Sequence, residues 1–210
     1  MISHKLDSRA VVRLHPRMRL APSSLSLHEQ DSVLGSASHS PREAAWLSLA
    51  LGTGLRLAEI VGLDVGDVYL PCGQPRVRVR LRPEIAKRGR AGDVFLPDGL
   101  KPKLAGFWSY KQAQGEQLDP TVPLFCSQTG RRLSKRRVQV LFRELQIQAG
   151  FDRNYPFHAL RHTAITNVYR ASKDLFLAQR FARHASPLTT VVYTHPSDEE
   201  LREGIRDLRC

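Results

Sequence analysis

The segment PREAAWLSLALGTG at 41–54 restricts the possible folds of this chain more than any other segment. It is apolar almost all round at helical spacing, and a helix of that kind has to be covered on every side. Ser-Pro-Arg-Glu at 40–43 is a strong helix start, and Gly52 and Gly54 mark the end. The chain has 210 residues, which suits one domain of ordinary size, with or without a short extension, and we expect that domain to pack around this central helix.

Similar start and stop signals predict helices around it. A capping box from Ser26 to Glu29 starts a short helix that runs to about Leu34, and a loop is expected over 35–40. Further helices are predicted over LRLAEIVGL at 55–63, from an N-cap at Asp98 to about Gln114, after Ser134 over 135–149, over 158–170, 174–183 and 187–194, and over 197–208.

Three strand-like segments predict a small antiparallel sheet between these helices. They are VYL at 68–70, the alternating RVRVRL at 76–81, and DVFLP at 93–97. A very basic, glycine-rich turn, AKRGRAG at 86–92, precedes the last of them. The predicted fold class is therefore mainly α with a small antiparallel β-sheet.

The charge of the chain indicates the kind of partner. Its 32 Lys and Arg residues against 20 Asp and Glu residues give a formal net charge of +12. Such a field favours a polyanion, for which nucleic acid is the default, although a basic surface without a specific partner is also compatible with it. Residues 1–25 form a basic leader, interpreted either as a frayed terminus or as an arm along DNA phosphates.

Several other classes of protein are disfavoured. Cys72, Cys126 and Cys210 have no CxxC spacing, which argues against a disulfide framework or a cysteine-rich zinc site and fits a reducing cytosol. No window approaches the roughly 18 consecutive apolar residues of a membrane span. The N-terminal MISHKLDSRAVVRLHPRM contains no apolar signal core, so we expect neither a signal peptide nor a membrane span.

The residues that carry chemistry lie between 156 and 195. His158 and Arg161 are three positions apart in a predicted helix, nearly one turn, so both can face one target. Arginine holds two phosphate oxygens at once, and two arginines with a few further donors can hold a phosphoryl transition state without a metal. His184 and then Tyr193 follow, and a tyrosine surrounded by cations is a usable nucleophile toward a phosphodiester.

Each of these side chains also has a purely structural interpretation. A helical His-x-x-Arg pair is often a surface or capping pair, and His184 can bind the last carbonyls of a helix. Tyr193 can be a half-buried core residue with a satisfied hydroxyl. Arg56 can pair with Glu59, and Lys87 can be one more solvated charge. No single residue is specific, whereas their order and spacing are.

The ordered set resembles the catalytic domain of the tyrosine recombinase (phage integrase) family over roughly residues 25–210. Three boxes carry the likeness in the right order and spacing: TGLRLAEIVGL, HALRHT and RHASPLTTVVYTH. Together with the lysine of the family's β-hairpin turn, they place six candidate catalytic residues: Arg56, Lys87, His158, Arg161, His184 and Tyr193.

The resemblance implies a division of labour in this site. The two arginines would clamp the scissile phosphate, and the two histidines would donate hydrogen bonds to it or move protons. Lys87 would protonate the leaving 5′ oxygen, and Tyr193 would become linked to the 3′ phosphate. Glu59 would be a supporting residue that orients the first arginine. Neither a metal ion nor another cofactor is implied.

Double-stranded DNA is the implied partner. Further candidate DNA contacts lie in the hairpin turn and at the start of the 135–149 helix: Arg88, Arg90, Lys135, Arg136, Arg137 and Gln139. The resemblance also implies a homotetramer on two DNA sites, a weak monomer when free, and a cytoplasmic, nucleoid-associated protein of a prokaryote. Residues 197–210 either pass to a neighbouring subunit or fold back on their own.

The sequence departs from the family pattern in three places. A leader over 1–25 is too short for the family's separate core-binding domain, so the expected division is this leader and a catalytic domain over 26–210, with an accessory DNA-binding protein as one replacement. The hairpin turn is longer and more basic than usual, so Arg88 or Arg90 is an alternative for part of the lysine's role. Ala-Arg-His at 182–184 replaces the common Leu-Gly-His, which adds a charge near the site.

The function expected from this set is site-specific recombination, in which DNA strands are cleaved and rejoined for integration, excision, inversion or resolution. One alternative is a type IB topoisomerase-like enzyme that nicks and closes DNA. Another is a DNA-binding regulator that keeps the fold without strand exchange. The six filled catalytic positions argue against the regulator.

Overall fold

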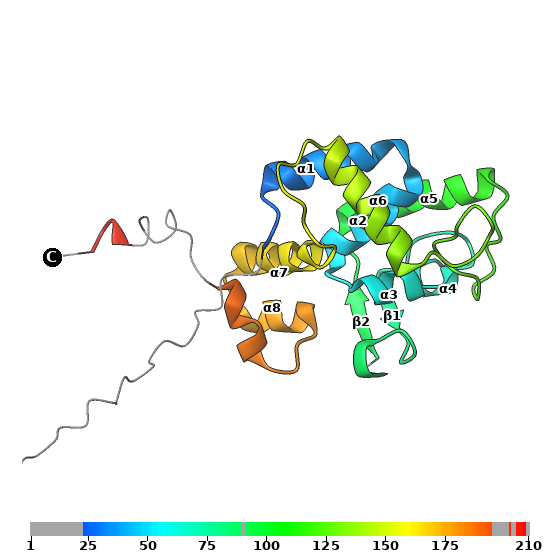
Figure 1. The fold of residues 1–210 in the computed structure, drawn as a ribbon. Coiled ribbons are helices and arrows are strands. Elements are labelled where there is room, and N and C mark those ends of the chain that lie inside the picture. The colour runs from blue at the N-terminus through cyan, green and yellow to red at the C-terminus, as the bar shows by residue number, and fades with distance from the viewer. Residues whose placement is uncertain (1–22, 90, 195–201, 203–204, 209–210) are drawn as a thin grey trace, which may run out of the picture.

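The computed structural model describes residues 23–89, 91–194, 202 and 205–208 (Figure 1). These residues form the helices α1 (Leu27–Ser36), α2 (Pro41–Thr53), α3 (Leu57–Gly62), α4 (Val65–Val68), α5 (Lys101–Ala113), α6 (Lys135–Gln148), α7 (His158–Ser172) and α8 (Leu175–Ala182), and the strands β1 (Arg78–Leu81) and β2 (Gly92–Phe95). The strands pair antiparallel, with Arg78 opposite Phe95 and Leu81 opposite Gly92. The predicted fold class, mainly α with a small antiparallel sheet, is confirmed.

Helix α2 occupies the centre, as its apolar sequence predicts. Trp46, Leu49 and Ala50 have no exposed surface, and α2 packs against α5 and α7. The Trp46 ring meets those of Phe142 in α6 and Phe157 before α7, with centroids 6.5 and 5.8 Å apart. Because α2 has 13 residues, its two ends lie about 20 Å apart. The candidate catalytic residues gather at its C-terminal end.

Local capping signals predicted three helix starts correctly. The Ser26 hydroxyl accepts a hydrogen bond from the Glu29 N–H at 3.2 Å, and the Glu29 carboxylate accepts one from the Ser26 N–H at 2.7 Å. This is the reciprocal capping box expected at the start of α1. Ser40 and Ser134 cap α2 and α6 through their side-chain oxygens.

The strand predicted over 68–70 is wrong. Helix α4 ends at Val68 instead, because the Asp67 carboxylate accepts a hydrogen bond from the Asp64 N–H at 2.9 Å and so stabilises a helical turn. Tyr69 then forms an isolated bridge with Pro75. Among the described residues, the sheet therefore has two strands rather than three.

Asp98 does not cap α5 as predicted. It lies in a 3-10 turn, Asp98–Leu100, that precedes the helix, and its carboxylate accepts a hydrogen bond from Lys101 Nζ at 2.7 Å. The Asp98 carboxylate therefore binds Lys101 instead of capping a backbone N–H of α5. The helix itself was predicted to end at about Gln114 and ends one residue earlier.

Two further boundaries differ from the prediction. The loop expected over 35–40 is mostly helical, since α1 continues to Ser36 and a 3-10 turn, Ala37–His39, follows with Ala37 fully buried. The helix expected over 187–194 is two 3-10 turns, Pro187–Thr189 and Val191–Tyr193. Ser186 makes no side-chain capping bond there.

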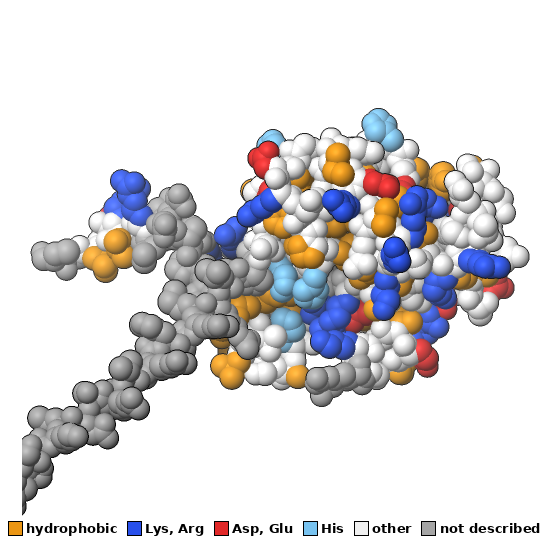
Figure 2. Space-filling model, viewed as in Figure 1, with side chains coloured by type: hydrophobic (Ala, Val, Ile, Leu, Met, Phe, Trp, Pro, Cys, Tyr) orange, Lys and Arg blue, Asp and Glu red, His pale blue; other side chains and the backbone are white. Residues whose placement is uncertain are grey.

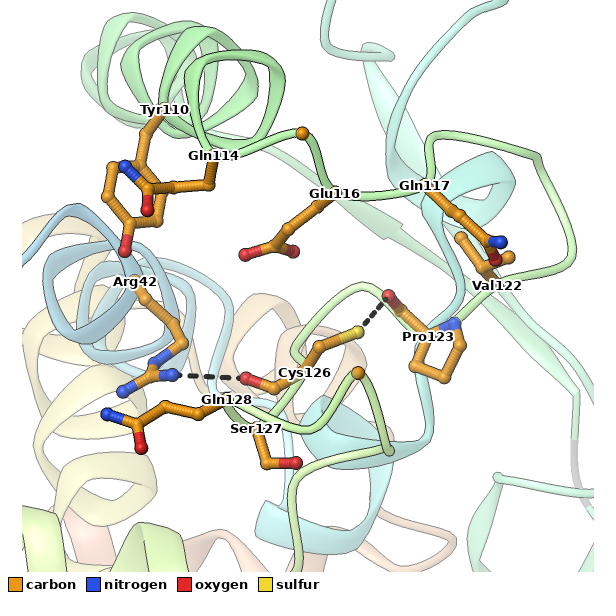
Figure 3. A pocket seen from close by; sticks show the side chains of 12 residues that line it. Arg42, Tyr110, Gln114, Glu116, Gln117, Val122, Pro123, Cys126, Ser127 and Gln128 are labelled. Atoms are coloured by element: carbon orange, nitrogen blue, oxygen red, sulfur yellow. Dashed lines mark hydrogen bonds between the residues drawn. The ribbon is translucent and has the colours of Figure 1, made fainter.

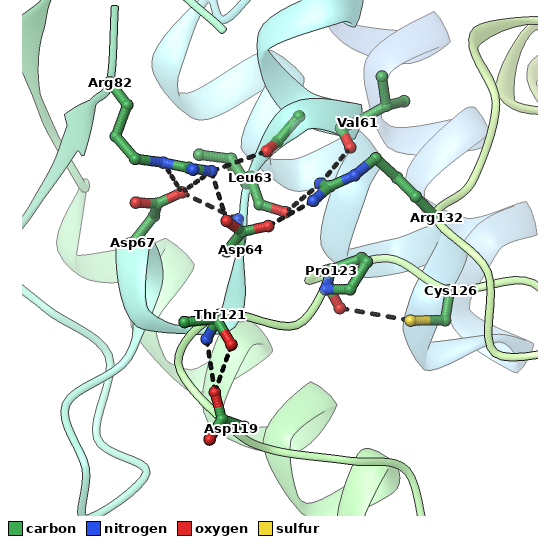
Figure 4. Close-up of polar contacts among 11 residues, drawn as sticks. Val61, Leu63, Asp64, Asp67, Arg82, Asp119, Thr121, Pro123, Cys126 and Arg132 are labelled. Carbon is green, nitrogen blue, oxygen red and sulfur yellow. Dashed lines mark hydrogen bonds and ion pairs between the residues drawn. The ribbon is translucent and has the colours of Figure 1, made fainter. Parts of the chain in front are cut away.

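An ion-pair network, which we call the Asp64 cluster, ties the hairpin to the helices (Figure 4). It consists of Asp64, Asp67, Arg82 and Arg132. Arg82 Nη2 lies 2.6 Å from Asp64 and 3.0 Å from Asp67. Arg132 pairs with Asp64 and donates from Nη1 to two carbonyls at the end of α3, at 3.0 and 2.9 Å. Two arginines thus meet two aspartates, and their charges balance.

A hollow of about 650 Å³ lies at the opposite end of α2 from the catalytic candidates (Figure 3). Arg42, in the first turn of α2, donates to the Cys126 carbonyl at 3.1 Å, and Glu116 is turned into the hollow. Glu116 is already paired with the buried Lys111. Burial raises the pKa of the Cys126 thiol, which disfavours thiolate chemistry at neutral pH.

The ends of the chain lie largely outside the described residues. These include the leader up to residue 22 and most of the segment 197–210 predicted to contain the last helix. Leu25, the last residue of the predicted leader, is buried in the core, and its N–H donates to Thr163 Oγ1 at 2.8 Å. No helix in the described part of the chain is long and apolar enough to cross a membrane.

Candidate active site

The residues singled out from the sequence meet in one pocket of about 340 Å³. Its wall consists of Arg56, Glu59, Lys87, His158, Arg161, His162, Arg183, His184, Ala185, Thr189 and Tyr193. All six candidate catalytic residues and Glu59 are therefore brought together. They come from the start of α3, the hairpin turn, the first turns of α7 and the segment after α8.

Arg56 is held by Glu59. Arg56 is the N-cap of α3, and its backbone N–H donates to Glu59 Oε2 at 2.8 Å while its Nη1 donates to Oε1 at 3.1 Å. The Glu59 side chain is 2% exposed and that of Arg56 is 22% exposed. The pair therefore buries its carboxylate and leaves the other donors of the arginine at the pocket.

Arg161 is almost completely buried, with 2% of its surface exposed. Its guanidinium donates to the carbonyls of Gly54 and Ala182, at the C-terminal ends of α2 and α8. These carbonyls carry the negative end of each helix dipole and so offset the buried charge. Burial lowers the pKa of Arg161 to about 10, and Arg56 and Arg183 act in the same direction, so it stays charged at neutral pH.

Tyr193 lies in the 3-10 turn that follows Thr190, where it packs into a small apolar cluster between α7 and α8. Only 8% of its surface is exposed. Burial raises the pKa of Tyr193, and the nearby Arg161 and Arg56 act against that rise. The phenol is therefore neutral in the free protein, and it needs a proton acceptor to act as a nucleophile.

The sequence interpretation missed the partner of this hydroxyl. His162 Nδ1 lies 2.6 Å from the Tyr193 hydroxyl. The His162 ring meets the His158 ring edge-on, with centroids 4.5 Å apart. Burial lowers the pKa of His162 to about 4, so its imidazole is neutral near pH 7. The signal was present in the sequence, because His158 and His162 are four residues apart and share a helix face.

His184 is fixed from two sides. Its Nδ1 lies 2.9 Å from the hydroxyl of Thr190, which is fully buried. Its backbone N–H donates to the Gln179 carbonyl at 3.1 Å, and Gln179 Nε2 donates back to the His184 carbonyl at 3.2 Å. Burial lowers the pKa of His184 to about 4. Thr190 and Gln179, which the sequence interpretation did not assign, thus orient the ring and its backbone.

Lys87 and His158 also line the pocket. Lys87 is exposed on the hairpin, in a 3-10 turn over Lys87–Gly89. His158 is the first residue of α7. Burial lowers the pKa of His158, and Arg161, Arg56 and Lys87 act in the same direction.

Arg183 also enters the site, although the sequence had indicated only an added charge there. Its Nη2 lies 2.6 Å from Glu59 Oε2. Burial lowers the pKa of Arg183, against the effect of the Glu59 carboxylate. Three arginines and a lysine therefore line a pocket that holds one buried carboxylate, and the balance of charge is strongly positive.

The candidate DNA contacts on α6 are all exposed, in its first two turns: Lys135, Arg136, Arg137 and Gln139. Figure 2 shows histidines beside Lys and Arg side chains on one face of the molecule, with more basic side chains over α6. Arg90 lies outside the described residues, and only the backbone of Arg88 is described. In the described part of the chain, no three His, Cys, Asp or Glu side chains are grouped to hold a metal ion.

The family model described as the phage integrase family matches residues 26–200. The chain belongs to this family. Among curated relatives, the tyrosine recombinase XerC of Azotobacter vinelandii is 36% identical over 155 residues, which are 73% of this chain and 48% of that protein. The XerC of Vibrio vulnificus (strain YJ016) is 31% identical over 191 residues, 89% of this chain and 57% of that protein. The chain thus spans about half the length of the curated relatives it matches.

Solved structures of integrase-family proteins share the fold. The XerA recombinase superposes with a TM-score of 0.73 and 27% identity, covering 90% of this chain and 67% of that chain. The lambda integrase catalytic core superposes with a TM-score of 0.57 and 20% identity, covering 77% of this chain and 91% of that one, and shows a likeness of fold. The predicted catalytic-domain fold is therefore confirmed.

Proposed function

We propose that this protein is a tyrosine-type site-specific recombinase, which cleaves and rejoins DNA strands through a 3′-phosphotyrosine on Tyr193. The observation that carries the proposal is the Tyr193 hydroxyl, hydrogen-bonded to His162 in a pocket walled by Arg56 and Arg161. The names of its relatives agree with it: they are XerC tyrosine recombinases, and a XerH site-specific recombinase bound to its difH substrate shares the fold.

The two arginines bind the scissile phosphate. Arg161 is held by two helix carbonyls and Arg56 by Glu59, so neither has to reorganise when charge develops on the phosphorus. Their planar guanidinium groups suit the equatorial oxygens of a pentacoordinate phosphorus. His158 and His184 donate further hydrogen bonds to these oxygens.

The proton of the nucleophile goes to His162. Its neutral imidazole, with the ring proton on Nε2, accepts the Tyr193 hydroxyl proton at Nδ1 as the phenol oxygen attacks phosphorus. A P–O bond to Tyr193 forms and the bond to the 5′ oxygen breaks, and Lys87 gives a proton to that oxygen. Reversal of the same steps with a new 5′ hydroxyl rejoins the strand without ATP.

The proposal extends to the DNA complex. The exposed cations of α6 and the net charge of +12 support binding to the backbone of double-stranded DNA. The family resemblance supports a homotetramer on two DNA sites and a place in the cytoplasm of a prokaryote. It also supports the division into a leader over 1–25 and a catalytic domain over 26–210.

Covalent trapping on a suicide duplex tests the proposal. The duplex carries the candidate site from DNA flanking the gene, with a nick that lets the 5′ fragment leave after cleavage. Wild type should form a protease-sensitive adduct that peptide mapping places on Tyr193. Tyr193→Phe should form none while its DNA affinity stays within about threefold of wild type.

Two other results would overturn the proposal. Tight DNA binding by the wild type without any adduct would favour a DNA-binding regulator. An adduct with relaxation of supercoiled DNA, but no exchange between two sites on one plasmid, would favour a topoisomerase-like enzyme.

A further inference from the structure

We propose that Arg183 is a positioning residue, which acts through Glu59 to hold Arg56 in place for the scissile phosphate. This inference rests on the proposed function. The Glu59 carboxylate is bound on both oxygens. Arg56 Nη1 lies 3.1 Å from Oε1, while Arg183 Nη2 and the Arg56 backbone N lie 2.6 and 2.8 Å from Oε2.

The orientation of Arg56 depends on that carboxylate. Among the described residues, Glu59 is the one hydrogen-bond partner of the Arg56 guanidinium. The Arg56 backbone N–H and Nη1 each hold one oxygen of that carboxylate, but both belong to one residue, so this pair alone could shift as a unit. Arg183 binds Oε2 from another segment of the chain, so it anchors the carboxylate, and with it the Arg56 guanidinium, against that shift.

Arg183 also links segments that are distant in sequence. It is the C-cap of α8, directly before His184, and it reaches Glu59 in the first turn of α3, 124 positions earlier. Its Cδ would lie 3.6 Å from a Cβ added at Gly92, so the side chain passes close to the start of β2. One side chain therefore links the segment that carries His184 to the segment that carries Arg56, and it lies close to the hairpin that carries Lys87.

The backbone at this position gives a second argument. Arg183 has φ 53° and ψ 42°, the left-handed conformation that strains a residue with a side chain and that glycine adopts freely. Its Nη1 is buried without a hydrogen-bond partner among the described residues. Glycine would end α8 without either cost, so the termination of the helix does not explain an arginine here.

Substitutions at Arg183 separate positioning from folding. Arg183→Gly removes the contact with Glu59 and relieves the backbone strain, so the Tm should stay equal or rise. The rate of adduct formation at saturating DNA should fall about 10- to 100-fold, because a small misplacement of a catalytic group has that effect. DNA affinity should change less than about threefold. Arg180→Met, an exposed arginine on the same helix, is the matched control and should be neutral.

Two further variants show whether the effect passes through Glu59. Arg183→Lys keeps the charge and should recover part of the rate, whereas Arg183→Met keeps the length alone and should not. In a double-mutant cycle, Arg183→Gly should slow a Glu59→Gln protein much less than it slows the wild type.

The outcomes are distinguishable. Adduct formation by Arg183→Gly at the wild-type rate would overturn this inference and leave the proposed function intact. So would equal rates for the Lys and Met variants together with additive effects in the cycle. A wild type that forms no adduct would overturn both.

Discussion

The arginines at the two ends of helix α3 differ in how many carboxylates they meet. At its C-terminal end, in the Asp64 cluster, Arg82 and Arg132 meet two aspartates, and Arg132 also binds carbonyls of the chain. At its N-terminal end, Arg56 and Arg183 share the single carboxylate of Glu59. Arg161 stands beside them, bound to backbone carbonyls.

This difference in the number of carboxylates distinguishes an arginine with a structural role from one that can bind a ligand. An arginine whose charge is met by an acid of the same chain has no need of a ligand, and it fixes the elements that it joins. A pocket with more cations than acids carries a net field, which an anion from outside has to neutralise. By this criterion we infer that the Asp64 cluster is structural and that the pocket around Tyr193 is the place where the proposed function needs a phosphate to bind.

Of these substitutions, Arg56→Ala should slow DNA cleavage the most, because it removes a cation from the pocket. The rate of adduct formation should fall about 10³-fold, equal to about 4 kcal/mol of transition-state stabilisation. The Tm should change little, because the side chain is partly exposed and Glu59 keeps Arg183 as a partner. A large fall in Tm with unchanged cleavage would make this end of α3 structural as well.

His162→Asn tests the proton acceptor. Asparagine can keep a hydrogen bond near the Nδ1 position but is not basic, so single-turnover cleavage at pH 7 should fall about 10²-fold. The deficit should shrink as the pH rises toward the range in which the phenol ionises without help. An unchanged rate across that pH range would exclude His162 as the acceptor of the Tyr193 proton.

Arg132→Ala should have the opposite effect to Arg56→Ala: it should lower the Tm and leave the cleavage rate nearly unchanged. It removes an ion pair and two carbonyl contacts, about 1–2 kcal/mol for a side chain that is partly exposed, so the Tm should fall by roughly 2–8 °C. Cleavage well below the Tm should stay within about fivefold of wild type. The neighbouring exposed Arg131→Ala is the control, and an equal loss of Tm there would show that the Asp64 cluster adds no stability.

Acid should weaken the fold through the pocket histidines. His162 and His184 have pKa values of about 4 in the folded protein, below the ordinary value of 6.5. Between these values the unfolded chain binds more protons, so their contribution is complete above about pH 6.5 and is lost as the pH falls toward 4. The Tm of His162→Asn should fall less steeply over that window, and an identical slope would contradict this assignment.

Local signals made much of the fold predictable. Ser26, Ser40 and Ser134 each cap a helix through contacts within three residues, so the sequence alone contains the needed information. The segment 68–70 was predicted as a strand from its composition, but the carboxylate of Asp67 decided the outcome from outside that segment. The turns over 187–194 depend on tertiary contacts, such as the buried Thr190 against His184.

The catalytic residues that belong to the family's sequence motifs could be predicted from the sequence. The six candidate catalytic residues, chosen from their boxes, do lie around one pocket. His162 was not predicted, because the motif that indicates chemistry is the His158–Arg161 pair, and nothing in the motif distinguishes His162 from a helix residue with a structural role. The contact of Arg183 with Glu59 could not be foreseen, because nothing local indicates a pairing across 124 positions.

The most direct test of the charge argument removes the charge from the DNA. In the suicide duplex, one non-bridging oxygen of the scissile phosphate is replaced by a methyl group, which makes it a neutral methylphosphonate. Adduct formation by wild type and Arg56→Ala is then measured on both duplexes. If the arginine acts by neutralising phosphate charge, its loss should slow cleavage about 10³-fold on the phosphodiester and less than about tenfold on the methylphosphonate. Equal losses on the two duplexes would contradict the account.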